Sequence, residues 1–372
     1  MKILLIGPLP PLRGGISDFN KELLKNLIRT SDVHALSFKY LYPKYIFPGK
    51  SQFKNVVDDN LKIKKINAYN PISYLIALHY IIDLKPDKII STHWNPLFSL
   101  SYSIINFFSS KKIEKIGLMH NLKSHEDGLL DSFFLSLYFG SLDKVICLSD
   151  FTHKKIGNFF NCKSVSLFHP IPKLNQLCID RDKALTKKKF DPKKKYLLHF
   201  GLVRKYKGLD LLIKAFNHPS IRKQNIKLYV AGECYENQNK YFSLVKKLKL
   251  KKKIILDFNF KSLSEIQLLF SASDLIAQTY QSSTQSGVTP IAYHYRKPIL
   301  VSNVEGLKSQ IVTDKSGEIV EREPKAVANG ILKILDKTGT NFYTKNIEKV
   351  INKNSWGTFV NNWEEFISIK KY

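Results

Sequence analysis

The stretch HFGLVRKYKGLDLLIKAF, residues 199–216, decides the fold because it predicts a buried strand, a tight cationic turn and a helix in direct succession. Gly201 permits a tight backbone turn, and the apolar positions 209, 212, 213 and 216 have helical spacing. Arg204 and Lys207 are therefore expected at or just before a helix N-terminus, where free backbone N–H groups and the helix dipole favour an anion. This stretch alone leaves two interpretations open, a phosphate site and a solvated basic turn.

A second strand, turn and helix are predicted by LIAQTYQSSTQSGVTPIAYHYRKPILVS, residues 275–302. Thr284, Ser286, Gly287 and Val288 stand where this second helix is expected to begin. Ligands of parallel sheets bind beyond the carboxyl ends of the strands, so the two turns are expected to face one crevice if their strands are neighbours. Two half-sites of this kind suit a diphosphate. An ordinary Ser/Thr helix cap is the alternative.

Together these segments resemble the donor half of glycosyltransferase family 4, whose members use nucleotide-sugars. The resemblance implies an α/β protein of the GT-B fold, with two Rossmann-like domains facing each other across a cleft. MKILLIG, residues 1–7, predicts a buried strand, and PLPPLRGGISDFNKELL, residues 8–24, is similar to the family's N-terminal glycine loop. The resemblance implies that Gly14 and Gly15 approach the acceptor and the donor phosphate.

The segment KIGLMHN, residues 115–121, is similar to the family's strand that ends in a histidine beside the donor sugar. The resemblance implies that His120 contacts the donor sugar or the acceptor hydroxyl, and that Asn121 and Glu126 bind the acceptor. A hydrogen-bonded structural histidine at a strand end is the alternative reading of His120.

For the second domain, the resemblance implies that Gly201, Glu233 and the turn residues 284, 286, 287 and 288 bind the donor. Arg204 and Lys207 would stabilise the leaving diphosphate as negative charge grows on it. Many relatives carry two glutamates around the second turn, and Ser283 and Ile291 occupy those places here.

The resemblance implies a retaining, metal-independent glycosyltransferase of bacterial surface-polysaccharide type, acting on a saccharide or lipid-linked saccharide acceptor. No cofactor is expected besides the nucleotide-diphosphate-sugar substrate. Three alternatives stay open: a non-catalytic sugar-binding relative, a partner subunit of another enzyme, and a nucleotide-sugar epimerase of the same fold.

The charge is unusual, because 59 Lys and Arg against 31 Asp and Glu leave a formal net charge of +28. Such an excess attracts polyanions, which include nucleic acid, anionic lipids and pyrophosphate-bearing substrates. No nucleic-acid-binding module is visible, so no nucleic-acid partner is expected. The segment 176–195 contains the densest basic run and predicts a solvated linker between the domains.

The four cysteines lack ligand spacing and predict buried free thiols.

The loop FKYLYPKYIFPGK, residues 38–50, interleaves aromatic and basic side chains. Such a composition suits a lipid headgroup interface and predicts contact with an anionic membrane surface, with packing on its own domain as the alternative.

No apolar run approaches the roughly 18–20 residues of a membrane span, and YLIALHYII, residues 74–82, is typical of a packed helix. No signal peptide is recognisable, so a cytoplasmic protein is expected, with peripheral attachment to the inner face of the membrane.

Strand and helix patterns alternate along the chain, which predicts parallel sheets. The domain boundaries expected are 1–175 (acceptor domain), 196–350 (donor domain) and 351–372 (a helix that packs back on the first domain). Strands are expected near residues 2–6, 33–38, 62–67, 88–93, 115–120, 144–148, 164–168, 196–200, 227–231, 254–258, 275–280, 298–302 and 318–320.

Overall fold

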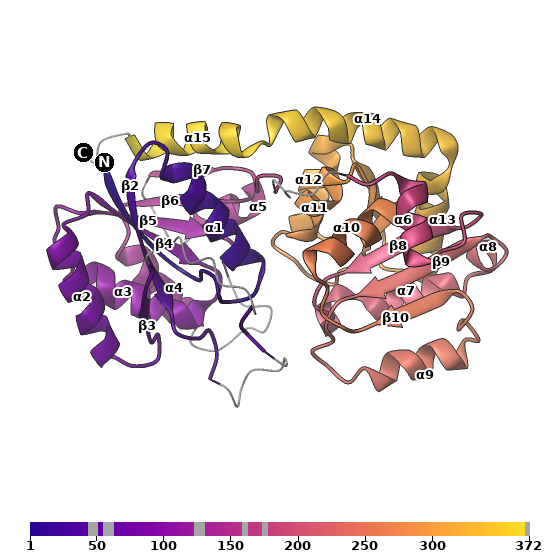
Figure 1. The fold of residues 1–372 in the computed structure, drawn as a ribbon, viewed down its shortest axis with the longest axis horizontal. Coiled ribbons are helices and arrows are strands. Elements are labelled where there is room, and N and C mark those ends of the chain that lie inside the picture. Colours follow the sequence, from indigo (N-terminus) through magenta and orange to yellow (C-terminus); the bar gives the residue numbers. More distant parts are fainter. Residues whose placement is uncertain (44–50, 55–62, 123–130, 158–162, 173–177, 369–372) are drawn as a thin grey trace. The chain divides into compact units, whose positions relative to one another are not determined.

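The computed structural model describes residues 1–43, 51–54, 63–122, 131–157, 163–172 and 178–368. The chain divides into two units (Figure 1). Unit 1 comprises Met1–His169 and Trp356–Tyr372, and unit 2 comprises Pro170–Ser355.

Unit 1 is built on a parallel sheet of seven strands in the order β3-β2-β1-β4-β5-β6-β7. The strands are β1 (Lys2–Ile6), β2 (Asp32–Phe38), β3 (Ile63–Ile66), β4 (Lys88–His93), β5 (Glu114–Met119), β6 (Lys144–Cys147) and β7 (Lys163–Ser166). The helices of this unit are α1 (Gly15–Leu27), α2 (Ile72–Leu84), η1 (Pro96–Phe98), α3 (Ser99–Phe108), α4 (Asp131–Gly140), α5 (Asp150–Ile156) and α15 (Trp356–Ser368). The strand order reverses between β1 and β4, which is where ligands bind in sheets of this kind.

Alternate residues of each strand pack on opposite faces of this sheet, as the pleat requires. Leu4 and Ile6 belong to a core shared with α2, α3 and α4, whereas Ile3 and Leu5 belong to a core shared with α1 and α15. The second core confirms that the C-terminal helix packs on the first domain. Trp363 of α15 is completely buried there.

Helix α2 departs from the expectation of a packed helix. Tyr74, Ala77 and Ile81 are buried against the sheet, but Leu75 and Ile82 are 65% and 67% exposed. The apolar run therefore supplies both the inner face of the helix and a face that solvent reaches. Periodicity could not reveal this, because the sequence is apolar on both sides.

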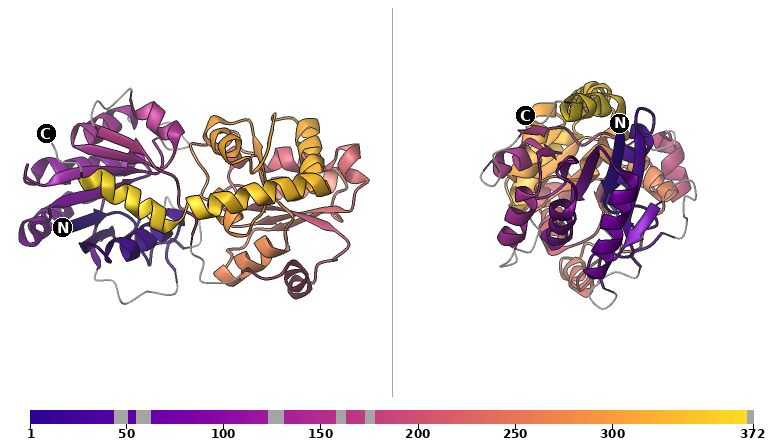
Figure 2. Two further views of the ribbon diagram at one scale, coloured as in Figure 1. Left: turned by 90° about the horizontal axis from the view of Figure 1, so that it is seen from above. Right: turned by 90° about the vertical axis from the view of Figure 1, so that its left-hand side faces the viewer.

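Unit 2 is built on a six-stranded parallel sheet in the order β10-β9-β8-β11-β12-β13. Its strands are β8 (Lys195–Phe200), β9 (Ile226–Ala231), β10 (Ile254–Asp257), β11 (Leu275–Gln278), β12 (Ile299–Ser302) and β13 (Gly317–Val320). Its helices are α6 (Arg181–Lys188), η2 (Lys205–Lys207), α7 (Leu209–Phe216), α8 (Pro219–Arg222), α9 (Asn239–Lys247), α10 (Leu263–Ala272), α11 (Val288–His294), α12 (Glu305–Asp314), α13 (Pro324–Leu335) and α14 (Lys337–Lys353). The two yellow helices in Figure 2 are α14 and α15, which follow each other in the sequence.

The helices of unit 2 also cover both sheet faces. One core joins the sheet to α7, α8, α9 and α13, and the other joins it to α10, α11, α12 and α14. Two α/β units with parallel sheets confirm the predicted fold class at the level of each domain.

The basic segment 176–195 differs from a solvated linker. It lies inside unit 2, where residues 181–188 form α6. Ala184 and Leu185 are buried in a small core with Tyr196. Arg181 also forms an ion pair with Asp274, with 2.9 Å between Nη2 and Oδ2. Lys183 and Lys187 of this run are exposed on the outer side of a packed helix.

The prediction of buried thiols holds for one cysteine and is wrong for another. Cys147 is buried, Cys234 is half-buried and Cys178 is exposed, and all three are free thiols. Cys162 lies outside the described residues.

The aromatic residues of the loop 38–50 that the structure describes agree with the alternative of packing on their own domain. Phe38 ends β2 and is buried among Phe98 and Tyr102, while Tyr40 stacks on Tyr69 with 6.0 Å between ring centroids. These aromatic rings pack on their own unit. Residues 44–50 lie outside the described residues.

None of the helices in the described part of the chain has the length and apolar character needed to cross a membrane.

Candidate active site

The turn after β8 is built by three glycines that bring backbone segments into contact. Gly201, Gly208 and Gly232 have φ angles of 101°, 62° and 132°, a region that favours glycine. A Cβ on Gly208 would lie 1.9 Å from the carbonyl oxygen of Thr279, and one on Gly232 would lie 2.3 Å from that of Gly201. The turns that follow β8, β9 and β11 therefore touch one another, and only glycine fits at these positions.

Lys207 lies in this turn with its ammonium group directed at the backbone of Gly201. A Cβ on Gly201 would meet Lys207 Nζ at 2.8 Å and Val288 at 3.8 Å. Lys207 is only 7% exposed, and its Nζ lies 5.3 Å from the centroid of the Tyr280 ring. Among the described residues, neither a carboxylate nor a hydrogen-bond acceptor contacts this ammonium group.

Burial lowers the pKa of Lys207, and the nearby Arg204 lowers it further, while Tyr206 acts in the opposite direction. A buried cation without an internal anion is unfavourable, because the charge has lost hydration and gained no partner. Such a group suits an anionic ligand that supplies the missing charge.

Arg204 immediately precedes η2 and is half-buried. Its guanidinium lies 5.3 Å from the centroid of the Tyr235 ring, and within the described residues it has no ion pair or hydrogen bond. A guanidinium held by an aromatic face keeps its N–H donors available for a phosphate. Helix α7 begins at Leu209, so both cations precede a helix N-terminus as predicted.

The second predicted turn lies beside the first, because β8 and β11 are neighbours in the sheet. Gln281 N–H donates to the Tyr206 carbonyl at 2.6 Å, and the Thr279 hydroxyl donates to the Gly208 carbonyl at 3.0 Å. The Ser286 hydroxyl lies 3.3 Å from the Tyr280 hydroxyl. The structure thus brings the segments around Lys207 and Ser286 together at the carboxyl edge of one sheet.

The remaining donor-side candidates surround these turns. Gly287 precedes α11, which begins at Val288, and Thr284 lies in the loop before it. A Cβ on Gly306 would lie 2.1 Å from the carbonyl oxygen of Ser283, so the start of α12 contacts the same loop. Glu233 follows β9, and its carbonyl accepts a hydrogen bond from Val203 N–H at 2.8 Å.

Sequence reasoning missed the aromatic residues that hold these turns. Tyr206 and Tyr280 contact each other edge to face with 5.9 Å between centroids, and Tyr235 faces Arg204. The sequence does place tyrosines next to basic residues. Tyrosine also occurs in ordinary protein cores, so these positions alone do not indicate contact with the cationic turn.

His199 lies directly before the turn, at the buried end of β8, and is 0% exposed. Burial lowers its pKa to about 3, and the charge of Lys207 contributes in the same direction. The imidazole is therefore neutral at physiological pH and adds no positive charge to that of Arg204 and Lys207.

In unit 1 the glycine loop precedes α1 in an open conformation. Gly14 has a φ angle of 130°, and a Cβ on Gly14 or Gly15 would meet nothing within 4 Å. The loop is fixed from both sides, because Asn20 Nδ2 donates to the Pro8 carbonyl at 2.9 Å and Arg13 Nη1 donates to the Ser51 carbonyl at 2.7 Å. This backbone is positioned by its neighbours and leaves room for a ligand at the two glycines.

His120 follows β5 and is buried beneath α1. Its ring contacts Phe19 edge to face with 4.7 Å between centroids and lies 6.4 Å from the ring of His169. Burial lowers the pKa of His120 well below its usual value, and the neighbouring His169 and His93 contribute in the same direction. His120 is therefore a neutral imidazole at physiological pH, able to share a hydrogen bond but not to supply positive charge.

Asn121 follows His120, and its carbonyl oxygen lies 3.0 Å from His93 Nδ1. The other ring nitrogen of His93 lies 2.9 Å from the Ser99 hydroxyl. His93 was not predicted as a site residue, and these contacts explain it as a structural histidine beside His120. Glu126 lies outside the described residues.

Acidification is expected to destabilise the protein through these histidines. Burial lowers the pKa of His93 to about 4 and that of His199 to about 3, so below about pH 6.5 the unfolded chain binds protons that the folded chain does not. Each histidine should then cost up to about 1.4 kcal/mol of unfolding free energy per pH unit between its unfolded and folded pKa values.

Urea unfolding followed by circular dichroism, at neutral pH and at successively lower pH, measures this slope. His93→Gln should make the slope shallower. A slope that does not respond to His93→Gln would contradict the assignment.

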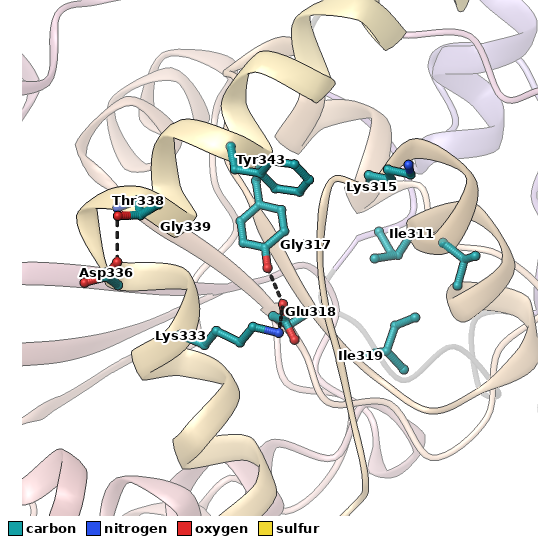
Figure 3. A pocket seen from close by; sticks show the side chains of 12 residues that line it. Ile311, Lys315, Gly317, Glu318, Ile319, Lys333, Asp336, Thr338, Gly339 and Tyr343 are labelled. Carbon is teal, nitrogen blue, oxygen red and sulfur yellow. Dashed lines mark hydrogen bonds and ion pairs between the residues drawn. The ribbon is translucent and has the colours of Figure 1, made fainter.

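A separate hollow of about 720 Å³ lies on unit 2 along the edge strand β13 (Figure 3). Glu318 points into it and is already paired, because it accepts a hydrogen bond from the Tyr343 hydroxyl and forms an ion pair with Lys333 at 2.8 Å. Two strands separate β13 from β8, so this hollow does not include the cationic turn.

Comparison with known proteins identifies the fold. Residues 180–353 match the family model of glycosyl transferases group 1. No curated protein sequence matches the chain significantly.

Solved structures of the same fold cover nearly the whole chain. Sucrose-phosphate synthase from Thermosynechococcus elongatus is 14% identical with a TM-score of 0.79, covering 99% of this chain and 98% of its own. A glycosyltransferase from Rickettsia africae is 17% identical with a TM-score of 0.76, covering 99% of each chain. The Anabaena protein HepE in complex with UDP is 15% identical with a TM-score of 0.80, covering 99% of this chain and 100% of its own. The predicted GT-B fold is confirmed.

Proposed function

We propose that this GT-B protein, whose residues 180–353 match glycosyl transferases group 1, transfers a sugar from a nucleotide-diphosphate-sugar to an acceptor hydroxyl. In this reaction the bond between the anomeric carbon and the diphosphate oxygen breaks, and a bond to the acceptor oxygen forms. The acceptor proton leaves to the departing phosphate or to solvent.

One observation carries the proposal, namely the buried ammonium group of Lys207, which no carboxylate in the described residues neutralises. A diphosphate would supply the missing negative charge and would be bound from a second side by Arg204. Anabaena HepE, which shares the fold, was solved with UDP, and this supports a nucleoside diphosphate as part of the donor.

The cations would do more than bind the donor. Negative charge on the diphosphate grows as its bond to the sugar breaks, so fixed positive charge stabilises the transition state more than the ground state. Lys207 is only 7% exposed, and an electrostatic interaction with a group so little exposed to solvent is stronger than one at the surface.

The finer features of the proposal follow the resemblance to glycosyltransferase family 4. They are retention of the anomeric configuration, independence of metal ions, and a lipid-linked saccharide acceptor in surface-polysaccharide synthesis. Gly14, Gly15 and His120 are proposed to meet the acceptor and the donor sugar, and the open backbone of the glycine loop supports this role.

Calorimetric titration of the full chain with nucleoside diphosphates and with inorganic pyrophosphate tests the binding step. A bound nucleoside diphosphate at a hundred times its dissociation constant should also stabilise the fold by about 2.7 kcal/mol. The proposal fails if no nucleoside diphosphate binds, or if Arg204→Ala binds as tightly as the wild type.

Product analysis then separates transfer from epimerisation. A transferase should release nucleoside diphosphate from its donor and should respond to added acceptor. An altered nucleotide-sugar formed without release of nucleoside diphosphate would instead establish an epimerase.

A further inference from the structure

Unit 1 presents an apolar surface on the outer sides of α2 and α3, which pack against each other at the flank of this unit (Figure 1). We call it the α2–α3 face. Its seven side chains are between 38% and 75% exposed: Ile72, Leu75, Ile76 and Ile82 on α2, with Leu100, Phe107 and Phe108 on α3.

The exposure of this face is not a by-product of core packing. The inward side of α2 already supplies Tyr74, Ala77 and Ile81 to the core, and α3 supplies Tyr102 and Ile105. A helix that only had to cover the sheet would carry polar residues on its outer side. Exposed apolar side chains gathered on two helices that pack against each other, rather than scattered singly, mark an interaction site.

Lysines flank the α2–α3 face. Lys85 follows α2, Lys111 and Lys112 follow α3, and all three are exposed. Lys64 on β3 is also exposed and lies over the ring of Tyr80 of α2, 4.2 Å from its centroid. Asp83 is the single carboxylate in the two helices, and it pairs with His79 at 3.4 Å.

We infer that the α2–α3 face docks on a lipid bilayer that contains anionic headgroups. Isoleucine, leucine and phenylalanine enter the boundary between headgroups and acyl chains, while lysines attract anionic lipids at the surface. A net charge of +28 adds long-range attraction to such a surface.

The composition favours a bilayer over a second copy of the chain. Protein interfaces are enriched in aromatic residues, Met and Arg and depleted in Lys. Five of the seven side chains of this face are instead aliphatic, its margin is formed by lysines, and it contains no arginine. Helix α2, with 13 residues, is far shorter than a membrane span and would lie in the plane of the interface. The inference rests on the proposed function for its biological meaning, because a lipid-linked acceptor is presented at such a surface.

Sedimentation of the full chain with vesicles tests the inference. We expect binding to vesicles of phosphatidylcholine mixed with phosphatidylglycerol, and weaker binding to phosphatidylcholine alone. The double variant Leu75→Gln, Phe108→Ser should bind the mixed vesicles about a hundredfold more weakly, roughly tenfold for each apolar side chain removed from the lipid.

The double variant Leu263→Gln, Phe342→Ser is the matched control, because these side chains are 63% and 53% exposed on unit 2. It should bind vesicles as the wild type does. Lys111→Gln with Lys112→Gln should weaken binding to mixed vesicles by about thirtyfold and leave binding to neutral vesicles unchanged.

Equal vesicle binding by the wild type and the Leu75→Gln, Phe108→Ser variant would overturn the inference. A dimer in light scattering that only this variant dissociates, without any change in vesicle binding, would assign the face to a second copy instead. Titration with a nucleoside diphosphate should be unaffected in all these variants. Vesicle binding without nucleoside diphosphate binding would leave the docking face standing and remove the proposed function.

Discussion

Lys207→Met is expected to lower the rate of sugar transfer by about a hundredfold to a thousandfold, the usual effect of removing one group that stabilises transition-state charge. The loss should appear mainly in kcat, because the ammonium group interacts most strongly with the diphosphate as it leaves. The rate of nucleoside diphosphate release from the donor measures the effect.

The same substitution is expected to raise stability. Burial of an uncompensated cation is unfavourable, and methionine fills a similar volume without a charge, so the free energy of unfolding should rise by about 0.5–2 kcal/mol. Lys205→Met in the same turn is the matched control, since Lys205 is exposed, and it should change neither quantity appreciably. A Lys207→Met protein that is both fully active and unchanged in stability would refute the assigned role of this side chain.

Trp363→Ala in α15 is expected to cost about 3–5 kcal/mol of unfolding free energy, because it removes a large buried side chain. Trp363 is 0% exposed and packs near Phe359, with 5.9 Å between ring centroids. Its indole N–H has no hydrogen-bond partner among the described residues. Trp363→Phe should therefore cost much less, since it keeps most of the volume and removes an unsatisfied donor.

Fluorescence makes this measurement specific to unit 1. The chain has three tryptophans, and all of them lie in unit 1: Trp94, Trp356 and Trp363. Urea unfolding followed by fluorescence should shift to lower urea in Trp363→Ala, while Asn362→Ala on the exposed side of α15 should behave as the wild type. If the two alanine variants unfold alike, α15 is not an integral part of this unit.

The strands were predictable because each is a short apolar run bounded by turn residues. The stretch before the cationic turn and the apolar spacing after it correctly indicated β8 and α7, and every expected strand has a counterpart within about two residues. The C-terminal helix was predictable for the same reason, because its aromatic residues recur with helical spacing.

The candidate site was predictable only where a local sequence pattern determines the backbone conformation. The cations at the start of α7 and the adjacent second turn follow from sequence and sheet order. That no carboxylate of the described residues neutralises Lys207 does not follow from the sequence, because it depends on which side chains the fold brings within 4 Å. The same holds for His120, whose low pKa results from its burial together with two other histidines.

The misinterpretations share one physical cause. The sequence of a segment does not show which neighbour covers its apolar or basic residues. The apolar run of α2 therefore predicts a fully packed helix, and the basic run in 176–195 predicts a fully solvated segment. The structure exposes part of the first and packs part of the second. Burial is decided by tertiary contacts that a single sequence does not display.

The return of α15 to the first sheet has a consequence for synthesis on the ribosome. Unit 1 is assembled from residues 1–169 and 356–372, so unit 2 emerges completely before the final piece of unit 1 is available. In a nascent chain the core positions that Trp356, Phe359 and Trp363 occupy therefore stay uncovered until these residues have emerged. A ribosome that stops shortly before residue 356 would release a chain with a complete second domain and an apolar opening in its first, which is a substrate for chaperones and proteases.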